Sequence, residues 1–214
     1  AIAFAVVILA WQNRQGAATS RLQTDQGHTF TAPADFNAPT PTDASVPETP
    51  TDAERRGRQF VRRAAADYNC MGHVFARARW EIDTGRMERI LDDNYERIEP
   101  GAEEVCCIIV WYGPDNAFTH VGLVVEVPGG GKPITTRSKD GTSSYVYDHK
   151  PDEVPGAPTY RIYCRRTTDG LSADAKRRLA TAKTLYEQVN DKSSPEARRR
   201  AEMLCQERNA LIDT

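Results

Sequence analysis

The chain has 214 residues, about one to one and a half ordinary domains, which leaves room for one hydrophobic core with appended segments. Its 28 basic and 30 acidic residues give a formal net charge of -2, and no basic stripe interleaved with aromatics occurs, so nucleic-acid binding is not expected. Five cysteines are too few for a disulfide-dense scaffold, and none has zinc-site spacing, so we expect no metal and no cofactor.

The first eleven residues form an uninterrupted apolar run that ends at Trp11. Because a bilayer-spanning helix needs about 20 apolar residues, we interpret residues 1–11 as the end of a truncated membrane anchor or as a signal-peptide core. A buried core strand or helix is the alternative. Residues 12–50 are polar and rich in Pro and Thr, which is typical of an extended linker. The sequence therefore predicts a domain tethered outside a membrane, on the periplasmic or cell-surface side.

Three helices are expected next. Thr51 and Glu54 make a capping box that predicts a helix over residues 52–66. Its arginines indicate a solvated basic face, with contact to acidic lipid headgroups or a partner surface as the alternative. A second helix is predicted to begin at or just after Cys70, and a short third one covers Met87–Leu91.

The central region is strand-like and completes a domain predicted to span residues 51–168. The candidate strands are apolar or β-branched, and turn residues such as Asp115 and Asn116 separate them. They are Val105–Trp111, Phe118–Val127, Lys132–Arg137, Ser144–Tyr147 and Thr159–Tyr163. Helices followed by an antiparallel meander predict an α+β fold.

A helical hairpin is predicted for residues 169–214. Ser172 and Ser194 are helix-start residues, and Pro195 occupies the first helical position after the second of them. The resulting αα-hairpin is expected to pack on the domain or on a partner chain.

Cys70 is the first candidate for chemistry because it stands at the expected start of a helix. Helix-end amides and a nearby imidazolium lower the pKa of a thiol, and the thiolate is the nucleophile. Gly72 allows close approach of backbone or substrate. A structural cysteine is the alternative interpretation.

His120 is the second candidate. It opens a predicted strand that follows another long apolar strand, so its imidazole can face a helix N-terminus across a cleft, as a Cys/His pair requires. A buried, hydrogen-bonded histidine is the alternative. His73 lies on the same helix as Cys70, and His149 lies in what the sequence indicates is a polar turn, so both fit less well.

These residues carry a resemblance. The chain resembles the NlpC/P60 superfamily of papain-like cysteine peptidases and amidases in three segments. These are a helix opened by Asn69-Cys70 and Gly72, a strand that ends in Trp111, and a following strand opened by Thr119-His120-Val121-Gly122. The resemblance covers Asp52–Arg165. It implies a Cys-bearing helix packed on a small antiparallel sheet and cleavage of amide bonds, commonly in cell-wall peptides, through a thioester.

The resemblance implies roles for individual residues. Cys70 would be the nucleophile and His120 the general base, with an oxyanion hole formed by the Cys70 amide and a neighbour such as the Tyr68 hydroxyl. Members of the superfamily carry a third polar residue on the following strand. This chain offers Thr136, Arg137 and Ser138 there, and of these Ser138 can accept a hydrogen bond from imidazole, whereas Arg137 would repel an imidazolium.

The remaining cysteines depart from the family pattern. Cys106 and Cys107 stand where the family usually has Gly-Asp. Adjacent cysteines rarely bridge each other, so in an oxidising compartment one of them could reach Cys164 or Cys205, which would leave Cys70 free.

Three functions follow from these observations. The leading hypothesis is a membrane-tethered extracytoplasmic cysteine hydrolase that cleaves an amide bond, for example in a peptide or in peptidoglycan. The alternative is a catalytically weak or inactive NlpC/P60-like accessory subunit that docks onto a membrane-protein assembly, which Arg137 and the Cys106-Cys107 pair favour. The third is an envelope scaffold with a buried Cys70 and His120.

Overall fold

The computed structural model describes residues 19–33, 57–63, 68–139, 145–154 and 156–213. The strands in this part are β1 (Thr19–Gln23), β2 (Thr29–Pro33), β3 (Gln59–Arg63), β4 (Tyr95–Arg97), β5 (Ile108–Tyr112), β6 (Phe118–Glu126), β7 (Thr135–Lys139), β8 (Tyr145–His149), β9 (Thr159–Arg165) and β10 (Ile212–Asp213). The α-helices are α3 (Cys70–Phe75), α4 (Met87–Asn94), α5 (Ala173–Glu187) and α6 (Pro195–Asn209), and the 3-10 helices are η1 (Thr84–Arg86) and η2 (Pro151–Glu153).

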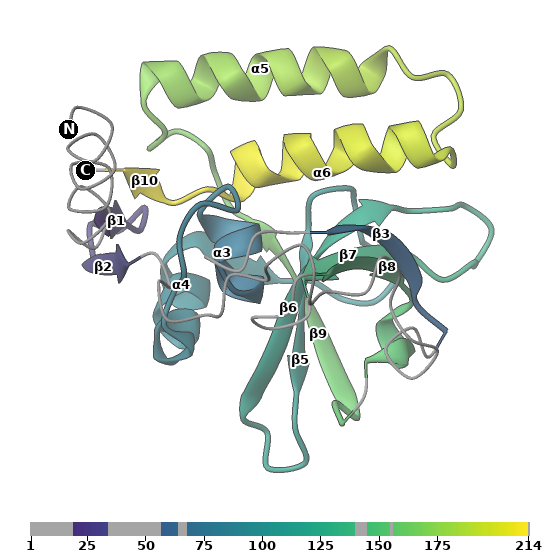
Figure 1. The fold of residues 1–214 in the computed structure, drawn as a ribbon, viewed down its shortest axis with the longest axis horizontal. Coiled ribbons are helices and arrows are strands. Elements are labelled where there is room, and N and C mark those ends of the chain that lie inside the picture. The colour runs from purple at the N-terminus through teal and green to yellow at the C-terminus, as the bar shows by residue number, and fades with distance from the viewer. Residues whose placement is uncertain (1–18, 34–56, 64–67, 140–144, 155, 214) are drawn as a thin grey trace, which may run out of the picture.

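Most of these strands belong to one antiparallel sheet with the order β3-β8-β7-β6-β5-β9-β4. A smaller sheet has the order β10-β1-β2. Helices α3 and α6 both pack against β6, and α5 lies on the outer side of α6 (Figure 1). The α+β class with an antiparallel sheet and several helices is therefore confirmed.

The sheet separates two hydrophobic clusters because successive side chains of a strand point to opposite faces. Every residue of β5 is buried. Ile108 and Val110 join α3 in one cluster, whereas Ile109 and Trp111 join the cluster on the other face. Strand β5 is thus a central strand covered on both sides, which explains its continuous apolar sequence.

The predicted helix at Cys70 is present but short. It ends at Phe75 because Arg77 and Ala78 adopt left-handed backbone angles, with φ of 52° and 56°, which stop helix propagation. All six residues of α3 are buried, so the helix is held by packing on both sides rather than by its length.

The helix predicted for residues 52–66 is wrong where the structure describes it. Gln59–Arg63 is strand β3, which pairs with β8 at the edge of the large sheet. Phe60 packs edge-to-face against Tyr145 and Tyr147, and this cross-strand aromatic contact outweighs the helical spacing of the segment. The capping box at residues 51–54 lies outside the described residues.

The predicted linker over residues 12–50 is also wrong in part. Thr19–Gln23 and Thr29–Pro33 form a β-hairpin whose Leu22 and Phe30 are paired and buried in the core. Residues 1–11 lie outside the described part of the chain. Among the residues that are described, none belongs to a helix with the length and apolarity needed to cross a bilayer.

The C-terminal αα-hairpin is present as predicted. Ser172 and Ser194 cap α5 and α6 through their side-chain oxygens, which accept hydrogen bonds from the Ala175 and Ala197 amides. Helix α6 is covalently joined to the sheet by the Cys106–Cys205 disulfide and shares its core. The hairpin therefore packs on the domain itself.

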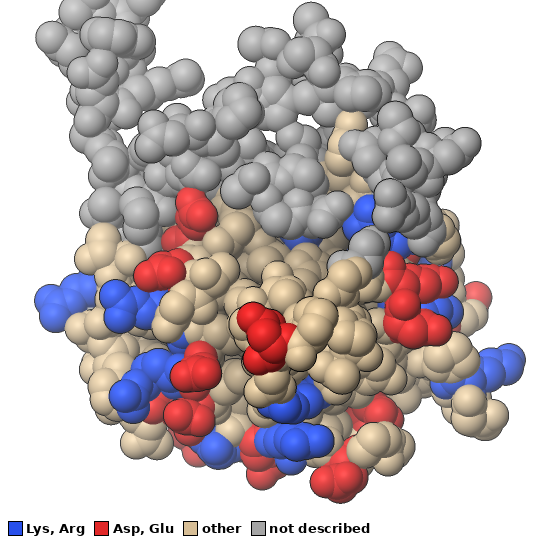
Figure 2. All heavy atoms as spheres, turned by 90° about the horizontal axis from the view of Figure 1, so that it is seen from below, with Lys and Arg blue, Asp and Glu red and all other residues tan. Residues whose placement is uncertain are grey.

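The described surface carries both signs of charge. Basic and acidic side chains are interspersed on the face shown in Figure 2. The large hydrophobic side chains exposed in the described part are scattered: Val127 follows β6, Tyr160 lies on β9 and Met203 lies on α6.

Candidate active site

Cys70 is the first residue of α3, and the side chain of Asn69 holds this helix start in place. Asn69 Oδ1 accepts a hydrogen bond from the Gly72 amide at 2.9 Å, and its Nδ2 donates to the Ile82 carbonyl at 2.7 Å. The thiol is 5% exposed and belongs to no disulfide. Asn69 therefore caps the helix and anchors it to the following loop.

The Cys70 thiol contacts the peptide unit of His120. Burial raises its pKa to about 11, and the Val121 amide, the Met71 amide and the charge of Lys139 oppose that rise. The Val121 amide belongs to the peptide bond that joins His120 to Val121, so the thiol lies beside the backbone of β6 at His120. At neutral pH the resting side chain is the protonated thiol.

The His120 imidazole packs on the indole of Trp111. The two residues are directly paired across β5 and β6, and their ring centroids are 5.4 Å apart. The Cys70 thiol thus reaches the backbone of β6 from the α3 side, whereas the His120 imidazole packs on Trp111, which belongs to the cluster on the opposite face of the sheet. The structure therefore does not bring the two side chains together.

Ser138, the candidate orienting residue, contacts a different histidine. Its Oγ is 2.7 Å from Nε2 of His149, which lies on β8 and is buried. The interpretation of His149 as part of a polar turn is therefore wrong. Thr136 lies on the same strand face as Ser138, and its Oγ1 donates to the His149 carbonyl at 2.8 Å. The structure thus places Ser138 at His149, whereas the sequence predicted it as a hydrogen-bond acceptor for His120.

Tyr68 and Gly72 are engaged within the protein. The Tyr68 hydroxyl hydrogen-bonds to the Arg62 guanidinium, and the Lys139 ammonium lies over its ring, 4.9 Å from the centroid. A Cβ atom on Gly72 would lie 1.8 Å from the Trp80 carbonyl oxygen. Gly72 therefore permits close approach of backbone, which the sequence predicted as one of its two possible uses.

A buried ion network lies beneath α6 and next to α3. Arg137 donates from Nε and Nη2 to both carboxylate oxygens of Asp148, at 2.7 and 2.8 Å, and from Nη1 to Glu202 at 2.9 Å. His73 Nε2 is 3.4 Å from Glu202, and burial lowers the pKa of His73 to about 4. Arg137 is thus occupied by carboxylates on the α6 side and serves packing of the helix on the sheet.

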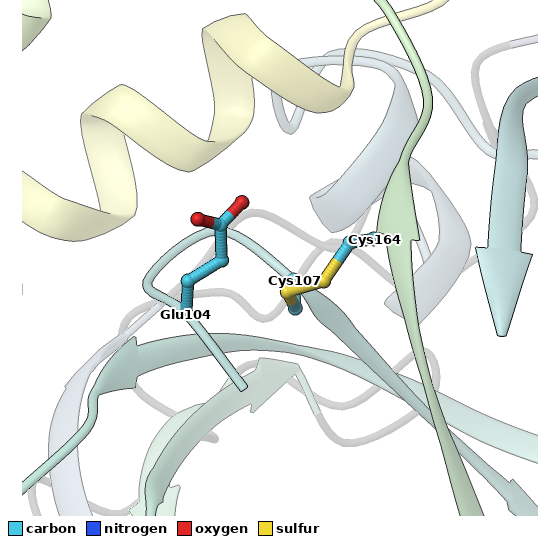
Figure 3. Close-up of side chains that lie close together, drawn as sticks. All are labelled: Glu104, Cys107 and Cys164. Atoms are coloured by element: carbon cyan, nitrogen blue, oxygen red, sulfur yellow. A yellow bond between two sulfur atoms is a disulfide. The ribbon is translucent and has the colours of Figure 1, made fainter. Parts of the chain in front are cut away.

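The other four cysteines form two disulfides, Cys106–Cys205 and Cys107–Cys164. Each of the adjacent cysteines bridges to a different element, so both predicted partners are used and Cys70 is free. Glu104 lies beside Cys107 and Cys164, with the candidate ligand atoms within 4.8 Å of one another. Figure 3 shows the two sulfur atoms bonded together, so this cluster supplies no thiolate to a metal.

Sequence reasoning missed Lys139 and His149. Both are buried polar residues on β7 and β8, and both lie close to the predicted site residues. Thr136 and Ser138 are two residues apart, and this alternation could have predicted that one face of β7 is polar. Nothing local indicated that Lys139 would be buried against Tyr68.

Comparisons with known proteins provide no relative: no family model, no curated protein and no solved structure matches the chain.

Proposed function

We propose that the protein is a catalytically inactive accessory subunit with an NlpC/P60-like fold, which docks onto a membrane-protein assembly. The observation that carries this proposal is the position of the two side chains: Cys70 lies in the cluster on the α3 side of the sheet, whereas the His120 imidazole packs on Trp111 in the cluster on the opposite face. A catalytic Cys/His pair needs both side chains in one cleft. Burial also raises the pKa of Cys70 to about 11, where an unassisted thiol is unreactive at neutral pH.

The proposed family is NlpC/P60, with a papain-like core. The support is the order of elements, in which the Cys-bearing α3 precedes the antiparallel β5, β6 and β7 and packs against β6. On this resemblance, a cell-wall peptide is the ligand class proposed for the domain.

The proposed location is extracytoplasmic. The two disulfides support it because such bonds persist in oxidising compartments and are rare in the cytosol. The buried position of Cys106 and Cys205 makes a transient redox role for that pair less suitable than a structural one. A membrane tether at residues 1–11 completes the proposal.

The disulfides make the test direct, since Cys70 is the one thiol of the unreduced protein. Hydrolysis of peptidoglycan fragments and of model peptide amides is measured for the wild type, Cys70→Ala and His120→Ala. We expect no hydrolysis that depends on Cys70 or His120, and no labelling of Cys70 by a peptidyl electrophile at neutral pH. Turnover by the wild type that is lost in Cys70→Ala contradicts the proposal.

A second function is a cysteine hydrolase that cleaves an amide bond, with Cys70 as the nucleophile. One observation favours it: the charge of Lys139 and the Val121 amide oppose the rise in the pKa of Cys70. Iodoacetamide labelling and peptidyl-electrophile labelling distinguish the two functions. If both are slow at neutral pH and rise together toward pH 11, with no dependence on His120, the accessory function is supported; fast labelling of Cys70 near neutral pH supports the hydrolase.

A further inference from the structure

Strand β3 forms one edge of the large sheet, and within the described part of the chain it pairs only with β8. Every second residue of an edge strand directs its backbone N–H and C=O groups away from the sheet, where they can pair with a further strand. A cavity of about 580 Å³ is lined by Gln59, Phe60, Val61 and Arg62 of this strand. Because successive side chains point to opposite faces, four consecutive lining residues place the cavity along the backbone edge of β3.

Helix α6, which lies above β3 in Figure 1, forms the opposite wall of this cavity, and we call the space between them the β3–α6 groove. The lining residues of α6 recur every three or four positions, which is the spacing of one helical face. They are Pro195, Arg198, Arg199, Glu202, Met203 and Gln206. This face is about 17 Å long, and the five residues of β3 span about the same length. The groove therefore suits an extended segment of about five residues.

The β3–α6 groove is positively charged where it meets solvent. Its two carboxylates, Asp148 and Glu202, are buried within the ion network beneath α6. The side chains of Arg62 and Arg199 are 42% and 65% exposed. Arg199 pairs with Glu196 on the same helix, and because both side chains are exposed this pair contributes little and can be exchanged for a carboxylate of a ligand. The groove therefore favours an acidic segment.

The edge of β3 also restricts which segments can pair with it. The strand is short, and its register with β8 shifts between Phe60 and Arg62, so Val61 has no partner across the ladder. Short strands and bulges limit indiscriminate pairing of a sheet edge. Specific recognition must therefore come from the α6 wall, where Met203 is exposed beside the arginines and offers an apolar contact.

From these features we propose that the β3–α6 groove binds an extended acidic segment of a partner protein, which adds a strand to the edge of the sheet. Backbone hydrogen bonds to β3 supply affinity, and Arg199 and Met203 select the acidic and apolar side chains that the segment turns toward α6. That the segment belongs to a membrane-protein assembly rests on the proposed function, whereas the groove itself does not.

The test uses the whole chain, unreduced, and the fluorescein-labelled peptide Thr-Glu-Thr-Val-Thr-Glu-Thr, in which every second side chain is acidic or apolar. Fluorescence polarisation measures its affinity for the wild type, Arg199→Glu and Arg177→Glu. Arg177 is the matched control because it makes an exposed pair with Asp174 three positions earlier on α5, as Arg199 does with Glu196 on α6. We expect Arg199→Glu to weaken binding about five- to tenfold and Arg177→Glu to leave it unchanged. A peptide with lysine in place of glutamate should bind more weakly by at least the same factor.

Amide hydrogen exchange distinguishes strand addition from contact with α6 alone. The peptide should slow the exchange of backbone amides within Gln59–Arg63, because an added strand accepts hydrogen bonds from the outer edge of β3. Binding without protection there, or no binding of the peptide at about 1 mM, overturns the proposal. Dimers of the chain that dissociate in Arg199→Glu, together with no peptide binding, likewise overturn it and assign the groove to a second copy. Cys70-dependent turnover overturns the proposed function and leaves the peptide result unaffected.

Discussion

Cys106 and Cys205 join the start of β5 to α6 across 99 residues of sequence, and both side chains are buried. The neighbouring Cys107 bridges instead to Cys164, 57 residues away. Two adjacent residues therefore tie the segment that leads into the central strand β5 to helix α6 and to strand β9. Such links restrict the unfolded chain, and the longer loop restricts it more.

We expect the double variant Cys106→Ala/Cys205→Ala to lose about 2–5 kcal/mol of unfolding free energy, the usual effect of removing a native disulfide. Urea denaturation of the unreduced protein measures the loss. Cys107→Ala/Cys164→Ala is the matched control and should lose slightly less, since its loop is shorter. A loss that is smaller for the longer loop than for the shorter one contradicts this account.

Arg137 should be essential for stability rather than for catalysis. Its removal leaves Asp148 and Glu202 as buried carboxylates, whose side chains are only 5% and 6% exposed, without their main partner. Arg137→Ala should therefore cost about 3–5 kcal/mol. Arg199→Ala is the control because its pair with Glu196 is exposed, and a change of about 0–1 kcal/mol is expected. Thermal and urea unfolding of both variants provide the measurement.

Elements that depend on nearby residues could be predicted from the sequence, whereas elements that depend on pairing with distant segments could not. Strands β5 and β6 and helices α4, α5 and α6 follow from apolar runs and capping residues within a few positions. Strand β3 does not, because its strand character depends on pairing with β8, more than eighty residues along the chain. The β1–β2 hairpin could not be predicted either, because Leu22 and Phe30 stand in a mostly polar segment and their burial depends on packing against the rest of the domain.

The candidate site shows the same division. Cys70 and His120 stand in short motifs, so they could be proposed from the sequence, but the register of β5 and β6 that turns their side chains to opposite faces could not. His149 and Lys139 have no motif, and their importance arises only from burial beside Trp111 and Cys70. The pairing of the four bridged cysteines was equally beyond the sequence, because spacing does not determine disulfide connectivity.

His73 should make the protein less stable in mild acid. Burial lowers its pKa from 6.5 to about 4, so between these values the unfolded chain takes up a proton that the folded protein does not. Stability is full above pH 6.5 and falls as the pH drops toward 4, by about 1.4 kcal/mol per pH unit for one such group. Urea midpoints measured across this range should fall less steeply for His73→Gln. A slope that is identical in the variant assigns the acid sensitivity to other groups, such as His149.

Gly72 should tolerate no side chain, because its Cβ would lie 1.8 Å from the backbone carbonyl oxygen of Trp80. Backbone cannot rotate away as a side chain does, so Gly72→Ala must move α3 or the loop that follows it. We expect the free energy of unfolding to fall by about 2–3 kcal/mol and Cys70 to move away from the Val121 amide.

Gly129→Ala is the control, since nothing lies within 4 Å of its added Cβ, and its stability should stay within about 0.5 kcal/mol of the wild type. Urea unfolding gives the stability of each variant, and the pH dependence of iodoacetamide labelling reports on Cys70. A Gly72→Ala protein with wild-type stability and an unchanged labelling profile is incompatible with this packing.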